Sequence, residues 1–316
     1  MKLQQLRYAL EVYRHNLNVS EAADALFTSQ PGISKQIRLL EEELGIQIFI
    51  RSGKRVVSVS QPGKAVLEIS ERILRDVQNI KNIGSEFTDH DSGSLTIATT
   101  HTQARYALPT IVAEFVKNYP KVNLTIKQGS PSAIAQMVSS GEADLAIITE
   151  RIDDHPELGK LPCYEWNHAV IVPHDHPLLD CRNPLSLEDL ASFPLVTYEF
   201  AFNSGSSIAR TFNKAHIEQP DVALSAADTD VLKTYVRLGL GVGLMAKMAY
   251  DPVVDQDLQL IDAAHLFEPS PTWIALRTDT YLRGYAYDFI QMFAPKLTRE
   301  AVDRILYTPV VEDFSI

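Results

Sequence analysis

The chain has 316 residues, 45% of them hydrophobic, which is enough to form the cores of two or three compact domains. Its net charge of -11 argues against a protein whose whole surface binds nucleic acid. The sequence opens without a basic-then-apolar signal pattern and contains no apolar run long enough to span a bilayer, so we expect a cytoplasmic protein with no membrane partner.

The charge is divided unevenly along the chain. Residues 1–64 hold nine Lys and Arg against six Asp and Glu, a balance of +3, and residues 65–316 carry the remaining -14. Phosphate affinity is therefore expected only at the N-terminal end, because the acidic remainder disfavours nonspecific binding to DNA.

Residues 20–44 have the pattern of two helices joined by a tight turn. Ser20 is suited to cap the first helix and Ser29 the second, with Pro31 in the first turn of the second helix. The apolar residues of the second helix recur every three or four positions and form one stripe: Ile33, Ile37, Leu40 and Leu44. An opening helix would close a three-helix core through Leu3, Leu6, Leu10 and Tyr13. The pattern fits an ordinary helical hairpin or a DNA-reading helix-turn-helix.

A basic turn and a short strand favour the DNA-reading alternative. Residues 51–55 are rich in Arg and Lys, and residues 56–60 alternate as a strand does, as in winged units that add phosphate contacts. We therefore expect residues 1–60 to form a winged helix-turn-helix domain that binds double-stranded DNA. The residues expected to contact DNA are Ser29, Gln30, Pro31, Ser34, Lys35, Arg38, Arg51, Lys54 and Arg55.

Residues 61–90 are predicted to form one long amphipathic linker helix. Its apolar positions recur every three or four residues: Val66, Ile69, Ile73, Val77, Ile80 and Ile83. The stripe either packs on its own domain or pairs with a second copy of the chain. Since a single helix-turn-helix reads few base pairs and normally acts in symmetric pairs, we predict a dimer through this helix.

Strand and helix patterns alternate from residue 91 onward, which predicts an α/β effector-binding domain over residues 91–316 with largely parallel sheets. Strands are expected at residues 94–99, 122–128, 144–149, 169–172, 195–198, 222–225 and 242–246, and helices at 104–118, 132–140, 208–215 and 230–238. Two stretches, near residues 162–166 and 267–273, resemble crossings between lobes. We expect a first lobe of about residues 91–164 and 268–297 and a second of about 165–267, with a ligand cleft between them. The segment after Thr298 is partly helical in pattern and has no assigned role.

Three junctions from strand to helix carry small hydroxyl or amide residues, at 99–103, 130–132 and 203–207. At each junction the free N–H groups of a helix N-terminus and the nearby hydroxyls can point toward a common site. Such a site favours the binding of a small anion by neutral donors. Thr149 ends an apolar strand at the same sheet edge. Taken alone, each junction is equally well explained as a helix cap.

Catalytic and metal-binding motifs are not found. The glycine-rich stretch 239–243 follows a helix and enters a strand, the reverse of the order in a dinucleotide site. His174 and His176 lie in a probable turn, and Cys163 and Cys181 form no CxxC motif. Free buried thiols are the preferred interpretation of the cysteines, with a redox pair as the alternative. We expect no enzyme activity, no cofactor and no metal.

Several segments carry a family resemblance. The N-terminal ones resemble the signature of LysR-type transcriptional regulators: residues 22–26, 29–34, 37, 40–41, 44–45 and 49–51. Further segments are similar to the CysB branch of that family, which regulates sulfur assimilation and cysteine biosynthesis: residues 16–20, 28–36, 97–109, 233–243 and 287–291. The resemblance runs from Met1 to about Arg304.

The resemblance implies a winged helix-turn-helix, a dimerising linker helix and a two-lobed effector domain like that of periplasmic binding proteins, assembled as a tetramer. It implies a mainly activating regulator that responds to an acetylserine-type inducer or a sulfate-like anion, with RNA polymerase as a further partner. The family's ligand site matches Thr100, Thr102, Gln103 and Thr149. We add Ser130 from its junction, Trp166 from its place beside a crossing, and Asn203, which stands where the family tends to have Thr.

Two other functions remain open. A regulator of genes for sulfonates and other alternative sulfur sources, similar to Cbl, would share these features. A solute-binding protein would share the two-lobed domain, although the missing signal pattern argues against it.

Overall fold

The computed structural model describes residues 1–53, 55–149, 155–181, 184–203, 206–217 and 220–307. Lys54, one of the predicted phosphate contacts, lies outside the described residues. The chain divides into two compact units, Met1–Thr88 and Asp89–Ile316. Within the described residues, no helix is both long enough and apolar enough to cross a membrane.

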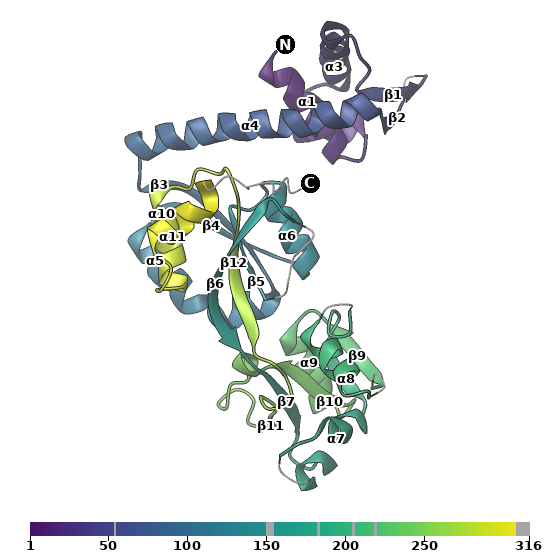
Figure 1. The fold of residues 1–316 in the computed structure, drawn as a ribbon, viewed down its shortest axis with the longest axis vertical. Coiled ribbons are helices and arrows are strands. Elements are labelled where there is room, and N and C mark those ends of the chain that lie inside the picture. Colours follow the sequence, from purple (N-terminus) through teal and green to yellow (C-terminus); the bar gives the residue numbers. More distant parts are fainter. Residues whose placement is uncertain (54, 150–154, 182–183, 204–205, 218–219, 308–316) are drawn as a thin grey trace, which may run out of the picture. The chain divides into compact units, whose positions relative to one another are not determined.

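The first unit contains three short helices, a two-stranded wing and one long helix (Figure 1). The wing strands β1 and β2 pair antiparallel, with Phe49 opposite Val59. In chain order the elements are α1 (Leu3–Arg14), α2 (Val19–Ala25), α3 (Gln30–Leu44), β1 (Phe49–Ser52), β2 (Arg55–Val59) and α4 (Gln61–Thr88).

The core of this unit forms where the apolar faces of α1, α2 and α3 meet. It contains Leu6, Ala9, Val12, Ala22, Ala23, Ile33, Ile37 and Leu40. The predicted stripes are wrong at their ends, because Leu3, Tyr13 and Leu44 are 47%, 52% and 39% exposed. These three side chains lie in the terminal turns of their helices, beyond the packed faces.

Helix capping agrees with the prediction for α3 but not for α2. The Ser29 hydroxyl accepts a hydrogen bond from the Gly32 N–H at 3.3 Å, which confirms Ser29 as the cap of α3. The prediction for Ser20 is wrong, because Asn18 caps α2 by accepting from the Ser20 and Glu21 N–H groups at 3.1 and 3.3 Å. Helix α3 ends at Gly45, whose φ of 69° is the left-handed conformation that glycine adopts without strain.

Helix α4 uses its apolar stripe in two ways. Near its start Leu67 and Ser70 are buried, and Val66, Ile73 and Leu74 pack partly against the core of the first unit. Further along, Ile80, Ile83 and Phe87 are 68%, 40% and 85% exposed. The stripe therefore packs on its own domain in the first half of the helix and is exposed in the second half.

The second unit has two lobes, each built on a five-stranded sheet. The first lobe has the strand order β4-β3-β5-β12-β6, and its strands are β3 (Ser92–Thr99), β4 (Lys121–Gln128), β5 (Leu145–Ile148), β6 (Leu158–Trp166) and β12 (Ser270–Arg277). Its helices are the π-helix η1 (Gln103–Ala107), α5 (Pro109–Asn118), α6 (Pro131–Ser139), α10 (Gly284–Phe293) and α11 (Arg299–Tyr307).

The second lobe has the strand order β11-β7-β10-β8-β9. Its strands are β7 (His168–Pro173), β8 (Leu195–Tyr198), β9 (Val222–Ala226), β10 (Val242–Ala246) and β11 (Leu258–Asp262). Its helices are α7 (Leu187–Ala191), α8 (Ser207–Lys214) and α9 (Thr229–Arg237), with 3₁₀ turns η2 (Pro177–Asp180) and η3 (Lys247–Ala249).

Both sheets are mixed, so the prediction of largely parallel sheets is wrong. Strands β4, β3 and β5 are parallel, but β12 pairs antiparallel with β5 and β6. In the second lobe β9, β8 and β10 are parallel, whereas β7 is antiparallel to β10 and β11. The antiparallel strands arise because β6, β7 and β12 belong to the two chain segments that pass between the lobes.

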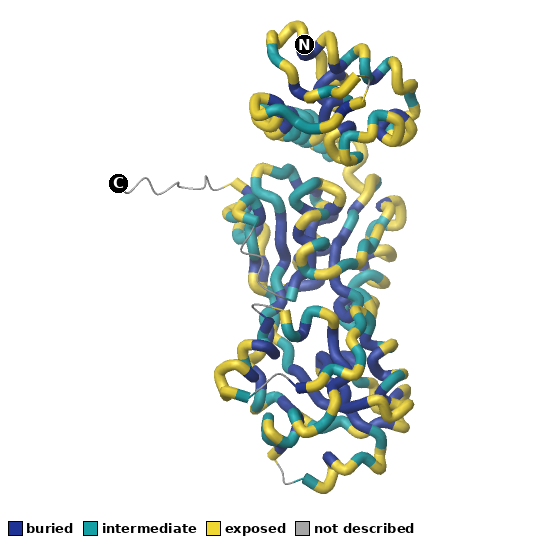
Figure 2. The backbone as a smooth tube through the Cα atoms, turned by 90° about the vertical axis from the view of Figure 1, so that its right-hand side faces the viewer, coloured by how far each residue is buried: buried dark blue, intermediate teal, exposed yellow. Residues whose placement is uncertain are grey.

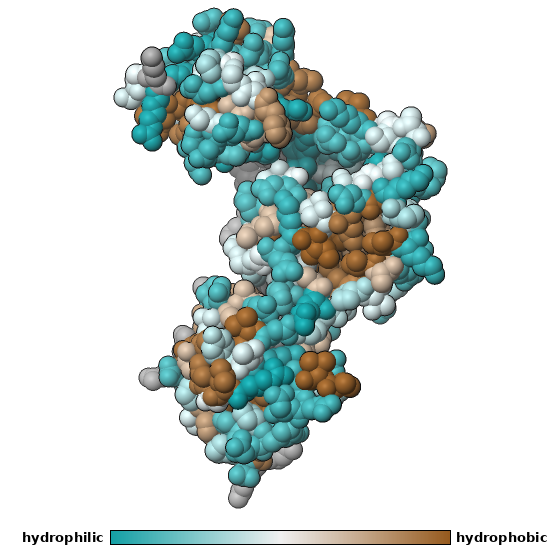
Figure 3. Space-filling model, turned by 180° about the vertical axis from the view of Figure 1, so that it is seen from behind, coloured by the Kyte–Doolittle hydropathy of each residue, from teal (hydrophilic) through white to brown (hydrophobic). Residues whose placement is uncertain are grey.

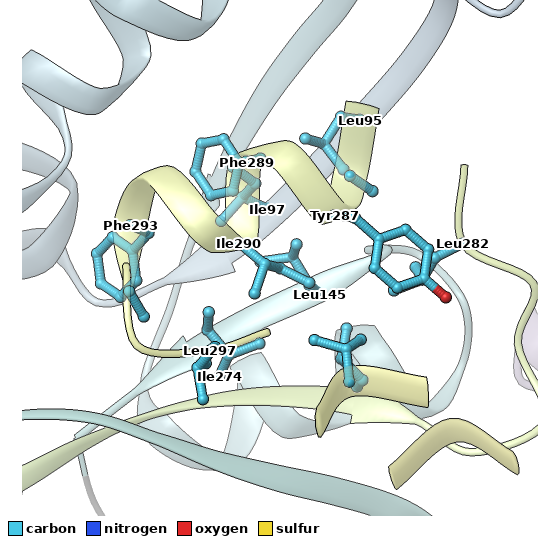
Figure 4. Close-up of a cluster of buried hydrophobic side chains, with 14 of the residues drawn as sticks. Leu95, Ile97, Leu145, Ile274, Leu282, Tyr287, Phe289, Ile290, Phe293 and Leu297 are labelled. Carbon is cyan, nitrogen blue, oxygen red and sulfur yellow. The ribbon is translucent and has the colours of Figure 1, made fainter. Parts of the chain in front are cut away.

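Each lobe has its own apolar core, and the buried stretches follow the sheet strands (Figure 2). In the first lobe Phe289, Ile290 and Phe293 of α10 lie with Leu145 and Ile274 of the sheet (Figure 4). Helix α11 belongs to the same core, because Val302 and Leu306 are buried in it. The expected end of the first lobe near residue 297 is therefore too early.

Candidate functional site

The outward face of α3 carries the residues predicted to contact DNA. Pro31, Lys35 and Arg38 are exposed on the side of the helix opposite the buried stripe, and Ser34 is half-buried between them. Ser29 and Gln30 are exposed at the helix start, and Arg55 is exposed in the wing. The local structure therefore presents a polar and cationic helix face to solvent, as a recognition helix requires.

Arg51 differs from the other predicted DNA contacts. Its guanidinium pairs at 2.8 Å with Glu41, whose side chain is 8% exposed, and donates to the Phe49 carbonyl oxygen at 3.3 Å. The other Glu41 carboxylate oxygen accepts from the N–H groups of Ile48 and Phe49 at 2.9 and 3.0 Å. Arg51 therefore has a structural role, joining α3 to the wing, that the sequence did not indicate.

A pocket in the second unit brings together five of the predicted ligand residues. Thr100, Thr102, Gln103 and Thr149 from the first lobe and Trp166 at the end of β6 line it. The second lobe and the crossing strands add His168, Tyr198, Phe200, Ala201, Ser206, Ser207, Ile208, Ala246 and Ser270. None of these lining residues is Asp, Glu, Lys or Arg, so the donors that face the pocket are neutral.

The sheet of the first lobe explains why its ligand residues meet. Strands β3 and β5 are parallel neighbours, with Thr99 opposite Ile147, so their carboxyl ends lie at one edge. Thr100 follows β3 and Thr149 follows β5, which places both hydroxyl residues at that edge. The chain then turns through η1, whose N-cap Thr102 and first residue Gln103 also line the pocket.

Thr102 and Gln103 also touch the second lobe. The Thr102 hydroxyl lies 3.0 Å from the Thr229 hydroxyl and 3.4 Å from the Tyr198 hydroxyl. The Gln103 side-chain oxygen accepts from the Tyr164 hydroxyl, and its amide lies 3.9 Å from the Met248 sulfur. Pocket residues of the first lobe therefore also contact the second lobe.

Charged groups extend this contact between η1 and the start of α9. Tyr106 donates to Asp230 at 2.6 Å, Arg105 pairs with Asp230, and His101 lies 3.0 Å from Asp228. Burial raises the pKa of Tyr106, and its hydrogen bond to Asp230 raises that pKa further, so the phenol stays protonated and remains a donor. We call these contacts, together with that between Thr102 and Thr229, the interlobe clasp.

Comparisons with known proteins identify the family. Residues 88–298 match the LysR substrate binding domain, and residues 3–64 match the bacterial regulatory helix-turn-helix of the lysR family. The chain belongs to the LysR family of bacterial transcriptional regulators. It is thus a DNA-binding regulator and not an enzyme.

Similar LysR regulators cover nearly the whole chain. The HTH-type transcriptional regulators SsuR and CysB of Burkholderia cenocepacia are each 50% identical over 306 residues, which are 97% of this chain and 99% and 97% of those proteins. Among solved structures, the cofactor-binding domain of the Cbl transcriptional regulator is 39% identical with a TM-score of 0.63. That match covers 69% of this chain and 95% of the Cbl domain.

Two of the ligand residues predicted for this LysR regulator lie outside the pocket lining. Ser130 is exposed and caps α6, accepting from the Ala133 N–H at 3.4 Å. Asn203 is exposed, and Ser206, Ser207 and Ile208 at the start of α8 provide this part of the lining instead. The capping bond of Ser130 is the one that the alternative of a helix cap predicts.

The sequence did not indicate several lining residues of the LysR pocket. Ser206 and Ser207 lie in the 203–207 junction, from which the sequence analysis predicts only Asn203 as a ligand residue. His168, Tyr198, Phe200 and Ser270 have no local pattern that sets them apart, because they reach the pocket only through the packing of distant strands. Among the described residues, no group of His, Cys, Asp and Glu is arranged to hold a metal ion.

Proposed function

We propose that this LysR regulator activates genes of sulfur assimilation and cysteine biosynthesis when an acetylserine-type inducer or a sulfate-like anion binds its effector pocket. The observation that carries this proposal is the neutral donor set of Thr100, Thr102, Gln103 and Thr149 in one pocket between the lobes. A small oxyanion is well held by hydroxyl, amide and backbone N–H groups without a counter-charge. The 50% identity to a regulator named CysB supports the same function.

The DNA-binding part of the proposal rests on the first unit. Residues 1–60 act as the winged helix-turn-helix, with Ser34, Lys35 and Arg38 at the major groove and Arg55 and the wing at phosphates. Arg51 acts through Glu41 and is not assigned a direct contact. The regulator works in the cytoplasm, where it meets promoter DNA and RNA polymerase.

Self-association completes the proposal. The exposed second half of α4 pairs with the same helix of a second copy, since Ile80, Ile83 and Phe87 are exposed apolar side chains on its stripe. Seen from behind, the first lobe carries an apolar patch on an otherwise hydrophilic surface (Figure 3). A second contact between copies that covers this patch would assemble the dimers into a tetramer.

A calorimetric titration of the full-length protein tests the ligand. Acetylserine, sulfate, adenylyl sulfate and a simple sulfonate are added in separate experiments to the wild type and to Thr149→Val, which keeps the shape of the side chain but removes its hydroxyl. We expect at least one anion to bind the wild type and to bind the variant about tenfold more weakly, through the lost hydrogen bond to charge. Failure of every anion to bind the wild type would contradict the proposal.

The same titration separates the alternative function. The chain is as similar to SsuR as to CysB, and the Cbl domain shares its fold, so a regulator of sulfonate or other alternative sulfur sources remains the second candidate. Binding of the sulfonate or adenylyl sulfate with no response to acetylserine would favour that second candidate.

A further inference from the structure

Arg283 and Tyr285 hold the segment through which the linker helix α4 enters the second unit. Arg283 is the N-cap residue of α10 and is 8% exposed. Its guanidinium donates to the Ser92 carbonyl oxygen at 2.7 Å and to the Asp89 carbonyl oxygen at 2.5 Å. The Tyr285 hydroxyl donates to the Ser94 carbonyl oxygen at 2.9 Å. We call these three hydrogen bonds the linker clamp.

The linker clamp depends on a close approach to Gly93. This residue has a φ of 147°, a conformation that residues with a side chain rarely adopt. A Cβ atom at Gly93 would lie 2.8 Å from the Arg283 Nη1 atom and 2.8 Å from the Tyr285 hydroxyl oxygen. The Arg283 guanidinium also lies over the Tyr285 ring, 5.0 Å from its centre. The two side chains therefore fit against each other and against the backbone at Gly93.

One bond of the clamp reaches beyond the sheet toward the linker helix. Asp89, His90 and Asp91 lie between the end of α4 and the start of β3, and all three are exposed. Pairing with β4 begins only at Ser92. The bond from Arg283 to the Asp89 carbonyl oxygen therefore restrains the direction in which the linker leaves the sheet. It is strong for a single bond, because a charged donor makes bonds about twice as strong as a neutral one.

Helix α10 connects the clamp with the effector pocket. Its last residue, Phe293, packs on the Tyr164 ring with 5.7 Å between the ring centres. The Tyr164 hydroxyl donates to the side-chain oxygen of Gln103, which lines the pocket. Arg283 and Tyr285 lie at the opposite end of the same helix. A change at the pocket can therefore reach the clamp through one rigid element.

Strand β3 provides a second connection. It begins at Ser92 in the clamp and ends directly before the pocket residue Thr100. Leu95 of β3 and Phe289 of α10 lie in one buried cluster, so the strand and the helix pack together (Figure 4). Because close-packed interiors transmit displacements, the strand and the helix are expected to shift together.

We propose that Arg283 and Tyr285 are positioning residues that set the direction in which the linker helix leaves the second unit, and that effector binding alters DNA binding through this clamp. Neither residue is among the described residues that line the effector pocket. Without the clamp, the effector would still bind but would no longer change the affinity for DNA. This inference rests on the proposed function, because it assumes an effector that alters DNA binding.

Three variants loosen the clamp from different sides. Arg283→Lys keeps the charge but replaces the two-pronged guanidinium with a single ammonium nitrogen. Tyr285→Phe removes only the hydroxyl, and Gly93→Ala places a methyl group where the two side chains lie. Arg277→Lys is the matched control, because Arg277 also donates to a backbone carbonyl oxygen of the first lobe, that of Ser139, at 3.1 Å. Thermal melting of each variant checks that it folds.

The first measurement needs no effector. Hydrogen exchange by mass spectrometry is followed on the full-length protein over residues 89–94. We expect Arg283→Lys to exchange at least about tenfold faster there than the wild type and Arg277→Lys, through the loss of bonds from a charged donor. Tyr285→Phe should show a smaller increase, because it loses one neutral bond. Exchange in Arg283→Lys equal to that in Arg277→Lys would overturn the clamp.

The second measurement compares coupling between the two ligands of the protein. Affinity for a promoter fragment is measured with and without acetylserine, and with and without sulfate, and the affinity for each small ligand is measured by calorimetry. We expect at least one of the two to change the DNA affinity of the wild type about fivefold or more. In Arg283→Lys the change should fall below about twofold while the affinity for the small ligand is retained, which a merely destabilised fold would not show.

The outcomes separate this inference from the proposed function. A variant Arg283→Lys that exchanges faster but keeps the wild-type coupling would overturn the clamp as the route from effector to DNA. An equal loss of coupling in Arg277→Lys would overturn it too, because the loss would then be a general effect of weakening the lobe. If neither ligand changes DNA binding by the wild type, the proposed function fails, and the exchange measurement alone decides whether Arg283 holds the linker.

Discussion

At the scale of single residues, Glu41 shows how a buried charged side chain fixes α3 to the wing. Its carboxylate is buried and bonds to the Ile48 and Phe49 N–H groups and to Arg51. The helix that carries Lys35 and Arg38 is thereby joined to the strand that begins the wing. Removing one partner of a buried charge pair lowers the stability of the fold by more than the intact pair contributes to it, because the other charge is left buried and unpaired.

Glu41→Gln is therefore expected to loosen the wing. The substitution keeps the shape of the side chain but weakens three hydrogen bonds to a charge, so we expect local stability to fall by about 2 kcal/mol. Hydrogen exchange by mass spectrometry over residues 41–60 should accelerate roughly 30-fold. Glu42→Gln, a change to the exposed neighbour, is the matched control. Equal exchange in the two variants would show that the Glu41 contacts do not hold the wing.

Arg38 provides the corresponding test of direct DNA contact. Its side chain is exposed on α3, so Arg38→Ala should leave stability nearly unchanged while weakening DNA binding by about tenfold. Fluorescence anisotropy with duplex DNA at several salt concentrations should also show a salt slope smaller by about one if the contact is to phosphate. Lys117→Ala on the effector unit removes an exposed charge of the same sign and should change neither quantity.

The same scale shows where sequence reasoning about the site succeeds. Thr100 and Thr149 could be predicted because each directly follows an apolar strand, and parallel neighbours end at a common edge. Arg51 could not be assigned its partner, because Glu41 lies ten residues earlier and the pair forms only when α3 packs beside the wing. His168 could not be predicted for a similar reason, since it reaches the pocket through the pairing of β7 with β10, more than 60 residues away in the sequence.

At the scale of elements, central strands were predicted most precisely, whereas the edge strands differ among themselves. The edge strands β4 and β9 agree with the prediction to within one residue, but β6 and β11 were not predicted. Both β8 and β10 are continuous apolar runs, and their bounds agree with the prediction to the residue. Strand β6 contains Gly159 and Pro162 and alternates with polar residues, so only its crossing was expected. Proline is tolerated there because β6 lies at the edge of its sheet and its ladder with β12 is irregular at that point.

The first helical segment of the effector domain is also divided by local chemistry. One helix was predicted over residues 104–118, but the structure has the π-helix η1 followed by α5, which begins at Pro109. Leu108 keeps helical dihedral angles, with φ -82° and ψ -26°, and the change from η1 to α5 coincides with Pro109, which has no N–H to donate to the preceding turn. Short π-helices frequently occur at functional sites, and η1 carries both pocket residues and the interlobe clasp.

Tyr106→Phe tests whether the interlobe clasp supports ligand binding. The change removes the hydrogen bond to Asp230, so the two lobes should separate more often. Pocket residues from the two lobes would then be less often close enough to bind one ligand together. We expect the affinity for the anion to fall about threefold to tenfold, with faster hydrogen exchange over residues 100–108. Tyr250→Phe removes a hydroxyl bonded at 3.1 Å within the second lobe and is the control. A stronger effect of Tyr250→Phe would contradict a role for the clasp.

At the scale of the whole molecule, function depends on charge being confined to one unit. Residues 1–64 carry +3 and the remainder carries -14, so a nucleic acid is attracted only by the part that bears the recognition helix. The effector pocket, by contrast, is lined by no Asp, Glu, Lys or Arg among the residues that the structure describes. An anionic ligand can therefore be held there by hydrogen bonds to neutral groups. The pocket then needs no cationic surface, which would attract DNA to the effector unit as well.

Assembly is the remaining property of the whole molecule, and α4 is where it can be tested. Ile73 packs partly on its own domain, so a charge there would disturb the fold as well as any dimer. Ile80 is 68% exposed and offers a cleaner position. Ile80→Asp should convert dimers to monomers in sedimentation experiments, because a carboxylate would be buried in an apolar helix contact.

The loss of dimerisation should also lower the affinity for DNA. A dimer binds two half-sites at once, so its second contact forms at high effective concentration, and a monomer loses that gain. We expect Ile80→Asp to bind a two-half-site promoter fragment at least 100-fold more weakly, while its affinity for a single half-site stays close to that of the wild type. Gln78→Glu adds the same charge to an exposed position about half a turn away and should leave both properties intact. A variant Ile80→Asp that remains dimeric would place the self-association surface on another part of the chain.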